Sequence, residues 1–319
     1  MSRADSRVCA EHPWLDSWNQ ANRDFYTSHH AEQHFQTPVH ASTRTAQTLA
    51  NLLTNLEEST KDLAIIDVGS GSGELLRQLS TRVPKSTTLI GIDQRPRPAD
   101  LPTRIVWQQR ELAEGDSEIL GSAESVNGIL VAHEFLDDIA CPIVELDDQV
   151  RPRVVLVDPT SGAEDLGPLL GDPAADRYLG NTTRVEAADW LDRWWPPTRA
   201  FARREIGTTR DRVWRGLTQT IDNGYCVAID YAHHRADRAA GLWDGGTMKG
   251  FANGAPRSAV PDGSMNITAH VALDACAGPR SAIHHQSELL GDTSLDSWPP
   301  ALGSFAWLIE QRGTTGMRA

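Results

Sequence analysis

The most chemically specific stretch of the sequence is a glycine-rich turn, Asp67-Val-Gly69-Ser-Gly71-Ser-Gly73. It follows a short apolar run, and a helical pattern begins directly after it. Glycine has no Cβ, so such a turn allows a ligand to approach the backbone closely. A dinucleotide fingerprint would need a sixth-position glycine where Glu74 stands. The shorter spacing, led by an acidic residue, better suits S-adenosylmethionine (SAM), with Asp67 or its neighbourhood meeting the ammonium group.

A second carboxylate follows at the spacing that nucleotide-binding folds use. Asp93 ends the apolar run Leu89–Asp93 and lies 20 residues after Gly73. Ribose-binding acids follow the glycine turn at about this offset. A glycine turn and an aspartate at a strand end also occur in ordinary loops. The turn, its flanking strands and Asp93 together favour a nucleoside-binding site.

An acidic loop, His133-Glu134-Phe-Leu-Asp137-Asp138, follows another apolar run, Val126–Ala132. In open α/β sheets, ligands bind at the carboxyl ends of the strands. Methyl transfer needs a nucleophile held in line with the departing sulfur, and carboxylates can pair bidentately with a guanidinium. We therefore predict that Glu134 and Asp137 orient an acceptor, and that His133 accepts a hydrogen bond or a proton. For Asp138 we expect an ordinary acidic residue in the first turn of a helix.

The elements that must position these residues alternate between strand and helix, which is typical of an α/β fold with parallel strands. Residues 1–38 and 158–182 are expected to be irregular, and Asp147–Gln149 to be the turn of a hairpin. The expected helices are Val39–Leu56, Glu74–Val83, two within Val185–Ile221, and further ones at Ala269–Cys276 and Ser304–Gln311. The expected strands are Leu63–Val68, Thr87–Ile92, Arg104–Trp107, Val126–Ala132 and Gly224–Tyr231.

Composition narrows the classes of function. The chain has 319 residues and a net charge of −13, which disfavours nucleic acid and anionic membranes as partners. Its four scattered cysteines match no zinc spacing and indicate a reducing compartment. Neither a signal peptide nor an apolar stretch of about 20 residues occurs. The eleven histidines include adjacent pairs but no HExxH motif. We therefore expect a cytoplasmic protein with no metal site and no membrane span.

Six segments in order resemble the MidA-type family of SAM-dependent methyltransferases, which includes a mitochondrial complex I assembly factor. Together the matches span roughly residues 23–272. They are Arg23–Ser28 ("G-D-F-x-T-S"), Asp67–Gly73 (the SAM turn), His133–Asp138 ("N-E-L-L-D-A"), Ala228–Tyr231 ("I-D-Y-G"), Gly246–Phe251 ("G-T-L-R-x-Y") and Asn266–Val271 ("D-I-T-A-H-V").

The resemblance implies a Rossmann-like class I methyltransferase core with an N-terminal cap and a helical insertion. The corresponding ranges are 1–60 (cap and lead-in helix), 61–160 (first part of the SAM-binding core), 161–222 (helical insertion or lid) and 223–319 (rest of the core). By the same resemblance, the residues that cover SAM would be Asp24, Thr27 and Ser28. The residues that hold SAM would be Gly69, Gly71, Gly73 and Asp93. The reaction cleft would be lined by Glu134, Asp137 and Asp230, with Thr268 and His270 nearby.

The activity that the resemblance implies is protein arginine methylation, with a protein substrate that family analogy places among respiratory-complex subunits. The chain departs from the family pattern on the substrate side, with His133 in place of Asn, Lys249 in place of Arg and Asn266 in place of Asp. We predict a SAM-dependent methyltransferase acting on a protein nitrogen, with arginine favoured. Two alternatives stay open: a small-molecule O- or N-methyltransferase with His133 as the base, and a SAM-binding assembly factor without turnover.

Overall fold

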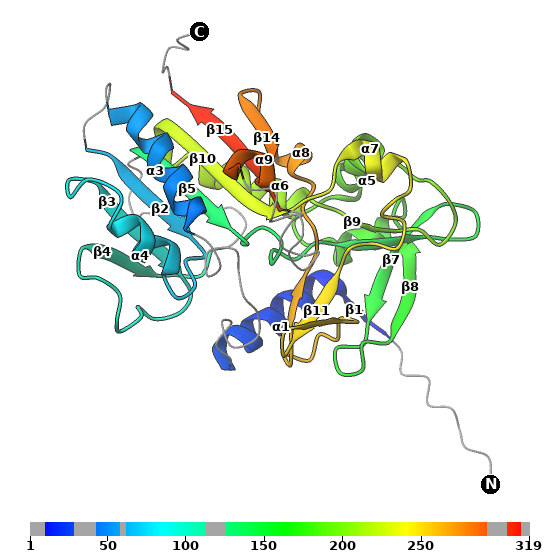
Figure 1. The fold of residues 1–319 in the computed structure, drawn as a ribbon. Helices are drawn as coiled ribbons and strands as arrows, with labels where there is room; N and C mark the ends of the chain where they lie inside the picture. Colours follow the sequence, from blue (N-terminus) through cyan, green and yellow to red (C-terminus); the bar gives the residue numbers. More distant parts are fainter. Residues whose placement is uncertain (1–9, 29–42, 58–61, 113–124, 292–304, 314–319) are drawn as a thin grey trace. The chain divides into compact units, whose positions relative to one another are not determined.

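The computed structural model describes residues 10–28, 43–57, 62–112, 125–291 and 305–313. The chain divides into two compact units (Figure 1). We call residues 31–137, 210–233 and 270–319 the core unit, and residues 1–30, 138–209 and 234–269 the accessory unit. The chain therefore leaves the core unit after Asp137 and again after His233.

The core unit is built on a seven-stranded sheet with the order β14-β15-β10-β5-β2-β3-β4. Numbered along the chain and taken in the opposite direction, from β4 to β14, these strands have the order 3-2-1-4-5-7-6. All neighbouring pairs from β4 to β10 are parallel, and β15 is antiparallel to both of its neighbours. The strands are β2 (Ala64–Val68), β3 (Thr88–Asp93), β4 (Ile105–Gln109), β5 (Val126–His133), β10 (Ile221–Tyr231), β14 (Ser281–His285) and β15 (Phe305–Arg312).

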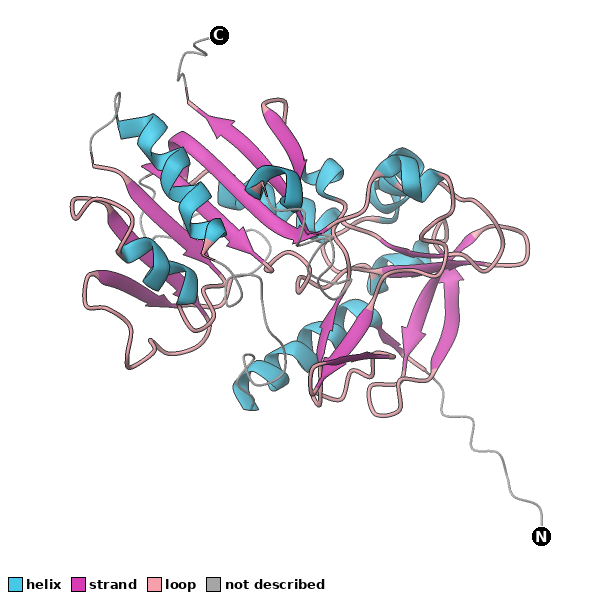
Figure 2. Ribbon diagram, in the orientation of Figure 1, coloured by secondary structure: helices cyan, strands magenta, loops and turns pink. Residues whose placement is uncertain are grey.

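The central strands of this sheet are buried because helices cover them. Every residue of β2 is buried, as expected for an apolar run between two parallel neighbours. Leu49 and Leu53 of α3 (Arg44–Glu57) and Leu76 of α4 (Glu74–Ser80) belong to the same apolar core as Ile65 of β2. Figure 2 shows both helices beside the sheet. The remaining helices of the core unit are α6 (Thr208–Thr218), whose first two residues belong to the accessory unit, α8 (Leu273–Cys276) and α9 (Gln286–Leu290).

The accessory unit holds two smaller sheets and its own apolar core. Helix α1 packs on this core through Trp14 and Trp18, and the Trp18 indole donates a hydrogen bond of 2.7 Å to the carbonyl of Ile267. The first sheet has the order β1 (His12–Pro13), β7 (Pro152–Val157), β6 (Ile143–Leu146) and β9 (Arg203–Glu205), and β8 (Glu164–Leu169) also pairs with β7. The second sheet has the order β12 (Ala255–Arg257), β11 (Lys249–Ala252) and β13 (Asn266–Thr268). The helices of this unit are α1 (Trp14–Ser28), η2 (Pro173–Tyr178), α5 (Arg184–Trp194) and α7 (Arg235–Ala239).

Three sequence-based expectations about elements were wrong. The N-terminal segment contains α1, whose buried positions 14, 18, 21 and 25 follow helical spacing among polar residues. The segment 158–182 contains β8 and η2. Residues 305–312 form a strand that pairs with two sheet neighbours. The sequence predicted a helix here because periodicity alone does not distinguish a short buried strand from a buried helix. The hairpin around residues 147–149 is confirmed by the antiparallel pairing of β6 and β7.

The two compact units also divide the chain differently from the four ranges expected from the sequence. The segment 161–222 contains helices η2, α5 and α6, but it contributes strands β8 and β9 to the accessory sheet as well. The accessory unit takes a further stretch, residues 234–269, from the range expected to complete the core. Both sheets of the accessory unit are antiparallel.

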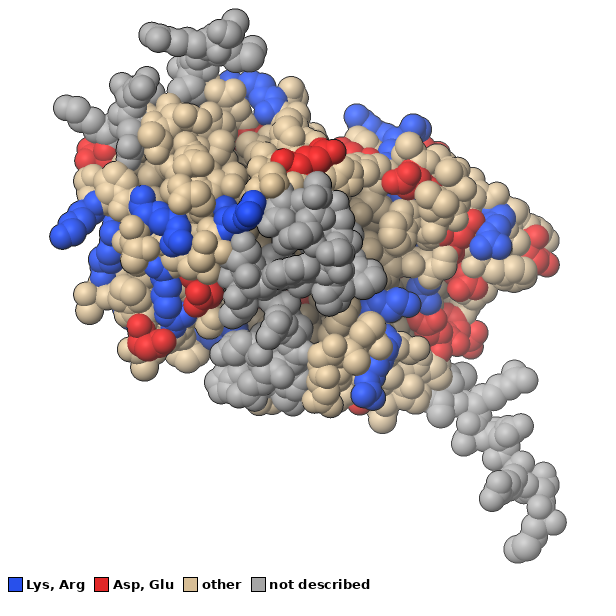
Figure 3. Space-filling view, viewed as in Figure 1, with Lys and Arg blue, Asp and Glu red and all other residues tan. Residues whose placement is uncertain are grey.

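Charges of both signs are interspersed on the face drawn in Figure 3, with several basic side chains over the part of the core unit that contains α4. Two arginines of the core unit, Arg104 and Arg77, have acceptors close by. Arg104 donates to the carbonyls of Ser80 and Pro84 at 2.8 and 2.9 Å, near the end of α4, where a cation is favourable. Arg77 pairs with Asp100 at 2.6 Å. Within the described residues, no helix is long and apolar enough to cross a membrane, and no cluster of three metal-binding side chains occurs.

Candidate cofactor and acceptor site

The sheet places the glycine turn and the acidic loop next to each other. Strand β2 has β3 on one side and β5 on the other, so the order of the strands reverses between β2 and β5. Ligands of open α/β sheets bind at such a switch point, beyond the carboxyl ends of the strands. The turn follows β2 and the loop follows β5. A Cβ at Gly69 would lie only 2.8 Å from Cδ2 of Phe135 in the loop.

The glycine turn adopts a backbone that other residues rarely adopt. Gly69, Gly71 and Gly73 have φ angles of 71°, 59° and 78°. Neighbouring side chains also pack where a Cβ would point, with Leu101 Cδ1 only 2.6 Å from that position at Gly73. The glycines therefore serve two purposes, since they allow left-handed φ values as well as close approach.

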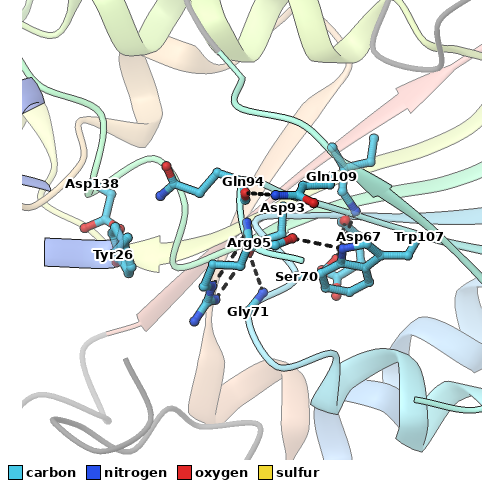
Figure 4. A network of polar contacts seen from close by, with 11 residues as sticks. Tyr26, Asp67, Ser70, Gly71, Asp93, Gln94, Arg95, Trp107, Gln109 and Asp138 are labelled. Carbon is cyan, nitrogen blue, oxygen red and sulfur yellow. Dashed lines mark hydrogen bonds and ion pairs between the residues drawn. The ribbon is translucent and has the colours of Figure 1, made fainter. Parts of the chain in front are cut away.

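Ser70 and Asp93 tie the turn to β3 (Figure 4). The Ser70 hydroxyl donates to the carbonyl of Asp67 at 2.7 Å and accepts from the amide of Ile92 at 3.2 Å. One carboxylate oxygen of Asp93 accepts from the amide of Gly71 at 2.8 Å. The carboxylate predicted to bind ribose thus lies against the turn, and its contact with ribose stays a prediction.

Arg95 also binds the carboxylate of Asp93, and the sequence did not predict this contact. Its Nε lies 3.0 Å from Asp93 Oδ1, and its amide donates to the same oxygen at 2.8 Å. Trp107 on β4 donates from its indole to the carbonyl of Arg95 at 3.1 Å (Figure 4). Arg95 Nη2 also donates to Asp93 Oδ2 at 3.3 Å, so the carboxylate accepts four hydrogen bonds from the chain, which is about its capacity. A ribose hydroxyl would bind Asp93 by replacing a contact with Arg95. The feature of the sequence that could have indicated this contact is the arginine two residues after Asp93, the acid that ends the strand.

Asp67 is a buried carboxyl group. Asp67 lies near the end of β2 and is 3% exposed. Burial raises the pKa of Asp67 to about 8; the Ser70 hydroxyl lowers it and the charge of Asp93 raises it further. The group is therefore largely protonated at neutral pH until a cation lies beside it.

Glu134 has a left-handed backbone, which is uncommon for a residue with a side chain. Its φ is 50°, and its amide donates to the carbonyl of Ile229 on β10 at 2.9 Å. Its side chain is 13% exposed, and Oε1 lies 3.7 Å from Nδ1 of His133. Such a conformation costs about 1–3 kcal/mol and is concentrated at functional sites. The predicted acceptor-orienting carboxylate therefore coincides with a strained backbone position.

Asp230 holds the acidic loop through its backbone. Oδ2 accepts from the amides of Leu136 and Asp137 at 3.0 and 3.3 Å, and Oδ1 accepts from the amide of Tyr231 at 3.0 Å. The residue is 0% exposed. The structure thus brings Asp230 together with Asp137, as predicted, and gives it a backbone-holding role that the sequence did not indicate. A contact of Asp230 with the acceptor stays a prediction.

A row of aromatic rings lies beside the acidic loop. The ring of His133 is parallel to that of Phe305, with centroids 6.0 Å apart. Tyr231 lies 4.1 Å from Phe305 and 5.7 Å from His270, and His233 lies 6.4 Å from His270. The sequence predicted His133 and His270 as site residues, but it missed the other three. Phe305 was missed because its strand read as a helix.

The phenol of Tyr231 lies within the electrostatic influence of the carboxylates. Its pKa is raised well above the ordinary value, first by burial and then by the charges of Glu134, Asp137 and Asp230. The hydroxyl therefore stays protonated and can donate a hydrogen bond. The hydrogen bonds from the amides of Leu136 and Asp137 to Asp230 hold this loop beside the end of β10.

Four predicted site residues belong to the accessory unit. Asp24, Thr27 and Ser28 lie in the last turns of α1, where the Thr27 hydroxyl donates to the carbonyl of Arg23 at 2.8 Å. Thr268 lies on β13, opposite Lys249 of β11. Their roles in covering SAM and in contacting the acceptor stay predictions.

Asp138 does not begin a helix, so that expectation was wrong. Residues 134–140 form turns between β5 and β6. A carboxylate oxygen of Asp138 accepts a hydrogen bond from the hydroxyl of Tyr26 on α1 instead (Figure 4).

A protein-family model matches residues 45–285, which is most of the chain. Its description is "Putative S-adenosyl-L-methionine-dependent methyltransferase". The chain belongs to this methyltransferase family. Its cofactor is therefore S-adenosyl-L-methionine, as predicted from the sequence. The role of the glycine turn in holding the cofactor stays a prediction. A search of curated proteins found no match to this methyltransferase.

Two solved structures show the same fold. A protein from Burkholderia thailandensis bound to S-adenosyl-homocysteine superposes on the methyltransferase with a TM-score of 0.70 at 18% identity, covering 95% of this chain and 88% of that chain. A second protein from Burkholderia thailandensis, described as uncharacterized, gives a TM-score of 0.66 at 17% identity, and the match again covers 95% of this chain and 88% of that chain. The class I methyltransferase fold predicted from the sequence is thereby confirmed.

The residues at the switch point fit SAM chemically. A buried carboxyl group, Asp67, suits a cationic ammonium group, because a neighbouring cation lowers the cost of ionising it. Asp93 lies beside the amide of Gly71, where a ribose hydroxyl would replace one of the contacts of Asp93 with Arg95. In the methyltransferase, these groups and the turn Gly69–Gly73 are the residues that would hold the cofactor.

Proposed function

We propose that the methyltransferase acts on a nitrogen atom of a protein, with the guanidinium group of arginine as the favoured acceptor. The observation that carries this proposal is that Asp230 of β10 accepts the amides of Leu136 and Asp137, and so holds the acidic loop at the sheet edge where the cofactor turn also lies. A cluster of carboxylates matches a cationic acceptor with several N–H donors, since charge-assisted bidentate pairs are strong and directional. The resemblance to MidA-type proteins supports the same acceptor.

The chemistry divides between the cofactor and the chain. SAM supplies an electrophilic methyl group on a positively charged sulfur. Glu134 and Asp137 would accept hydrogen bonds from the acceptor and hold one nitrogen in line with the methyl carbon. The nitrogen–carbon bond forms as the carbon–sulfur bond breaks, S-adenosylhomocysteine leaves, and the nitrogen loses a proton. His133, whose Nδ1 lies 3.7 Å from Oε1 of Glu134, would take that proton.

The second candidate is a small-molecule O- or N-methyltransferase with His133 as the base. The aromatic row favours it, because the rings of His133, Phe305 and Tyr231 offer a flat apolar surface beside the acids. A planar acceptor would stack there without needing a positive charge.

We also propose that the protein works in a reducing compartment such as the cytoplasm, and the state of its cysteines supports this. In the described part of the chain, Cys226 and Cys276 are both free thiols. Burial raises the pKa values of Cys226 and Cys276 above the ordinary value for a thiol, so both groups are unreactive.

The test is methyl transfer from tritiated SAM to matched acceptors. An arginine-rich peptide, the same peptide with citrulline in place of arginine, and a panel of planar phenols and heterocyclic amines would be compared. We expect label in the arginine peptide and none in the citrulline peptide. Label only in the small molecules would favour the second candidate, and SAM binding without label in any acceptor would favour an assembly factor.

The Glu134→Gln variant tests the orienting role. We expect transfer to fall by about a hundredfold or more, because a neutral amide cannot pair with the guanidinium charge. Affinity for S-adenosylhomocysteine should stay within about threefold of wild type, since Glu134 lies outside the glycine turn. Undiminished transfer would contradict the assignment of Glu134. Glu288→Gln, on the short helix α9, is the matched control and should leave both quantities unchanged.

A further inference from the structure

Arg210 joins two segments that the proposed acceptor site needs. It lies in the first turn of α6 and is 2% exposed. Its Nη2 donates to the carbonyl of Asp137 at 2.8 Å, and its Nη1 donates to the carbonyl of His270 at 2.8 Å. One guanidinium therefore bridges the acidic loop after β5 and the segment that follows β13. Neither the sequence pattern nor the family resemblance pointed to this residue.

The bridge completes a set of contacts that hold the acidic loop from both sides. Asp230 accepts the amides of Leu136 and Asp137, and Arg210 binds the carbonyl of Asp137. The loop also contains the left-handed backbone of Glu134. Strained conformations persist only where the surroundings over-determine them. Arg210 and Asp230 supply that constraint close to Glu134.

The His270 segment is itself attached to β10. The amide of Val271 donates to the carbonyl of Tyr231 at 2.7 Å, and the amide of His233 donates to the carbonyl of Val271 at 3.3 Å. Because Arg210 binds the carbonyl of His270, it fixes the distance between this attached segment and the acidic loop. The ring of His270 then lies beside Tyr231.

We propose that Arg210 is a positioning residue for methyl transfer, which sets the separation of the acidic loop from the His270 segment and so the orientation of Glu134 and Asp137 toward the acceptor. This inference rests on the proposed function. The guanidinium is required because its planar fork reaches two carbonyls at once in fixed directions, whereas a lysine ammonium is a single flexible point charge. Charge alone is therefore insufficient at this position.

The experiment compares Arg210→Lys and Arg210→Met with Arg215→Lys and Arg215→Met, which change an exposed arginine on the same helix. Hydrogen exchange, measured by mass spectrometry on the full chain, should be about tenfold faster in peptides covering 133–138 for both Arg210 variants. Exchange in peptides covering 64–93 should stay unchanged, as should affinity for S-adenosylhomocysteine. In the arginine-peptide assay, kcat should fall about a hundredfold in Arg210→Met, with a smaller change in KM. The Arg215 variants should match wild type.

Two results would overturn the inference. Unchanged exchange in 133–138, or wild-type exchange and kcat in Arg210→Lys, would show that the two-carbonyl bridge is not needed. Faster exchange throughout the core unit would show a general role in stability. Should Arg210→Met not fold, Arg210→Lys alone decides. Hydrogen exchange needs no acceptor, so its outcome stands even if the arginine peptide takes no label from wild type, a failure that belongs to the proposed function.

Discussion

At the scale of single residues, Gly69 occupies a position where both backbone and space exclude a side chain. Its φ is 71°, and a Cβ would meet Phe135 at 2.8 Å. A left-handed backbone costs about 1–2 kcal/mol for a residue with a Cβ. We predict that Gly69→Ala lowers affinity for S-adenosylhomocysteine at least about tenfold, because about 1.4 kcal/mol corresponds to that factor. Calorimetry measures it, and Gly171→Ala is the control, since a Cβ there meets no atom within 4 Å.

Asp67 predicts a pH dependence of stability. Its pKa rises from 3.8 in the unfolded reference to about 8 in the folded protein. A raised pKa means that the folded state retains a proton that the unfolded state loses. The group's contribution to stability is therefore complete below about pH 4 and declines as the pH rises to about 8. The free energy of unfolding of wild type, relative to Asp67→Asn, should fall across this window by up to several kcal/mol and be constant above it.

Cofactor binding should reveal the same carboxyl group. A cationic ammonium beside Asp67 lowers its pKa, so binding at pH 7 should release a proton from the protein. Calorimetry in buffers of different ionisation enthalpy counts this proton. We expect proton release in wild type that is absent in Asp67→Asn. Equal proton release in the two proteins would place the ammonium elsewhere.

At the scale of elements, strand β10 controls the loop that follows its neighbour β5. Asp230 at the end of β10 accepts three backbone amides. Hydrogen bonds to a charged group contribute about 1.5–3 kcal/mol each. We predict that Asp230→Asn lowers the free energy of unfolding by roughly 2–4 kcal/mol, measured by urea titration. Asp222→Asn, an exposed change on the same strand, should alter it by less than about 0.5 kcal/mol.

The glycine turn, Asp93 and the parallel strands could be predicted because local sequence determines them. The spacing of the glycines and the apolar runs that flank them are visible within a few tens of residues. The roles of Arg210, Arg95 and Asp230 could not, because each depends on hydrogen bonds between segments distant in sequence. Helix α1 was missed because its apolar residues are diluted by polar ones. Strand β15 was missed because it forms by pairing along both of its edges, with β10 and β14, and these partners are distant in sequence or not visible as strands.

At the scale of the whole molecule, the chain interrupts one methyltransferase core twice to build a second compact unit. The acidic loop lies directly before the first interruption, and the His233 and His270 positions flank the second. Core residues next to the points of insertion are thus the ones that the proposed acceptor site uses. The net charge of −13 is consistent with a cationic acceptor, but its effect is long-range and screened by salt.

The most direct test is calorimetry of the purified full-length chain with S-adenosylhomocysteine and, separately, with NAD. The whole interpretation depends on a nucleoside with a methionine-type tail binding at the turn that joins β2 to α4. We predict one binding site for S-adenosylhomocysteine, weakened by Gly69→Ala, and no heat with NAD. Binding of NAD with no binding of S-adenosylhomocysteine would contradict the account.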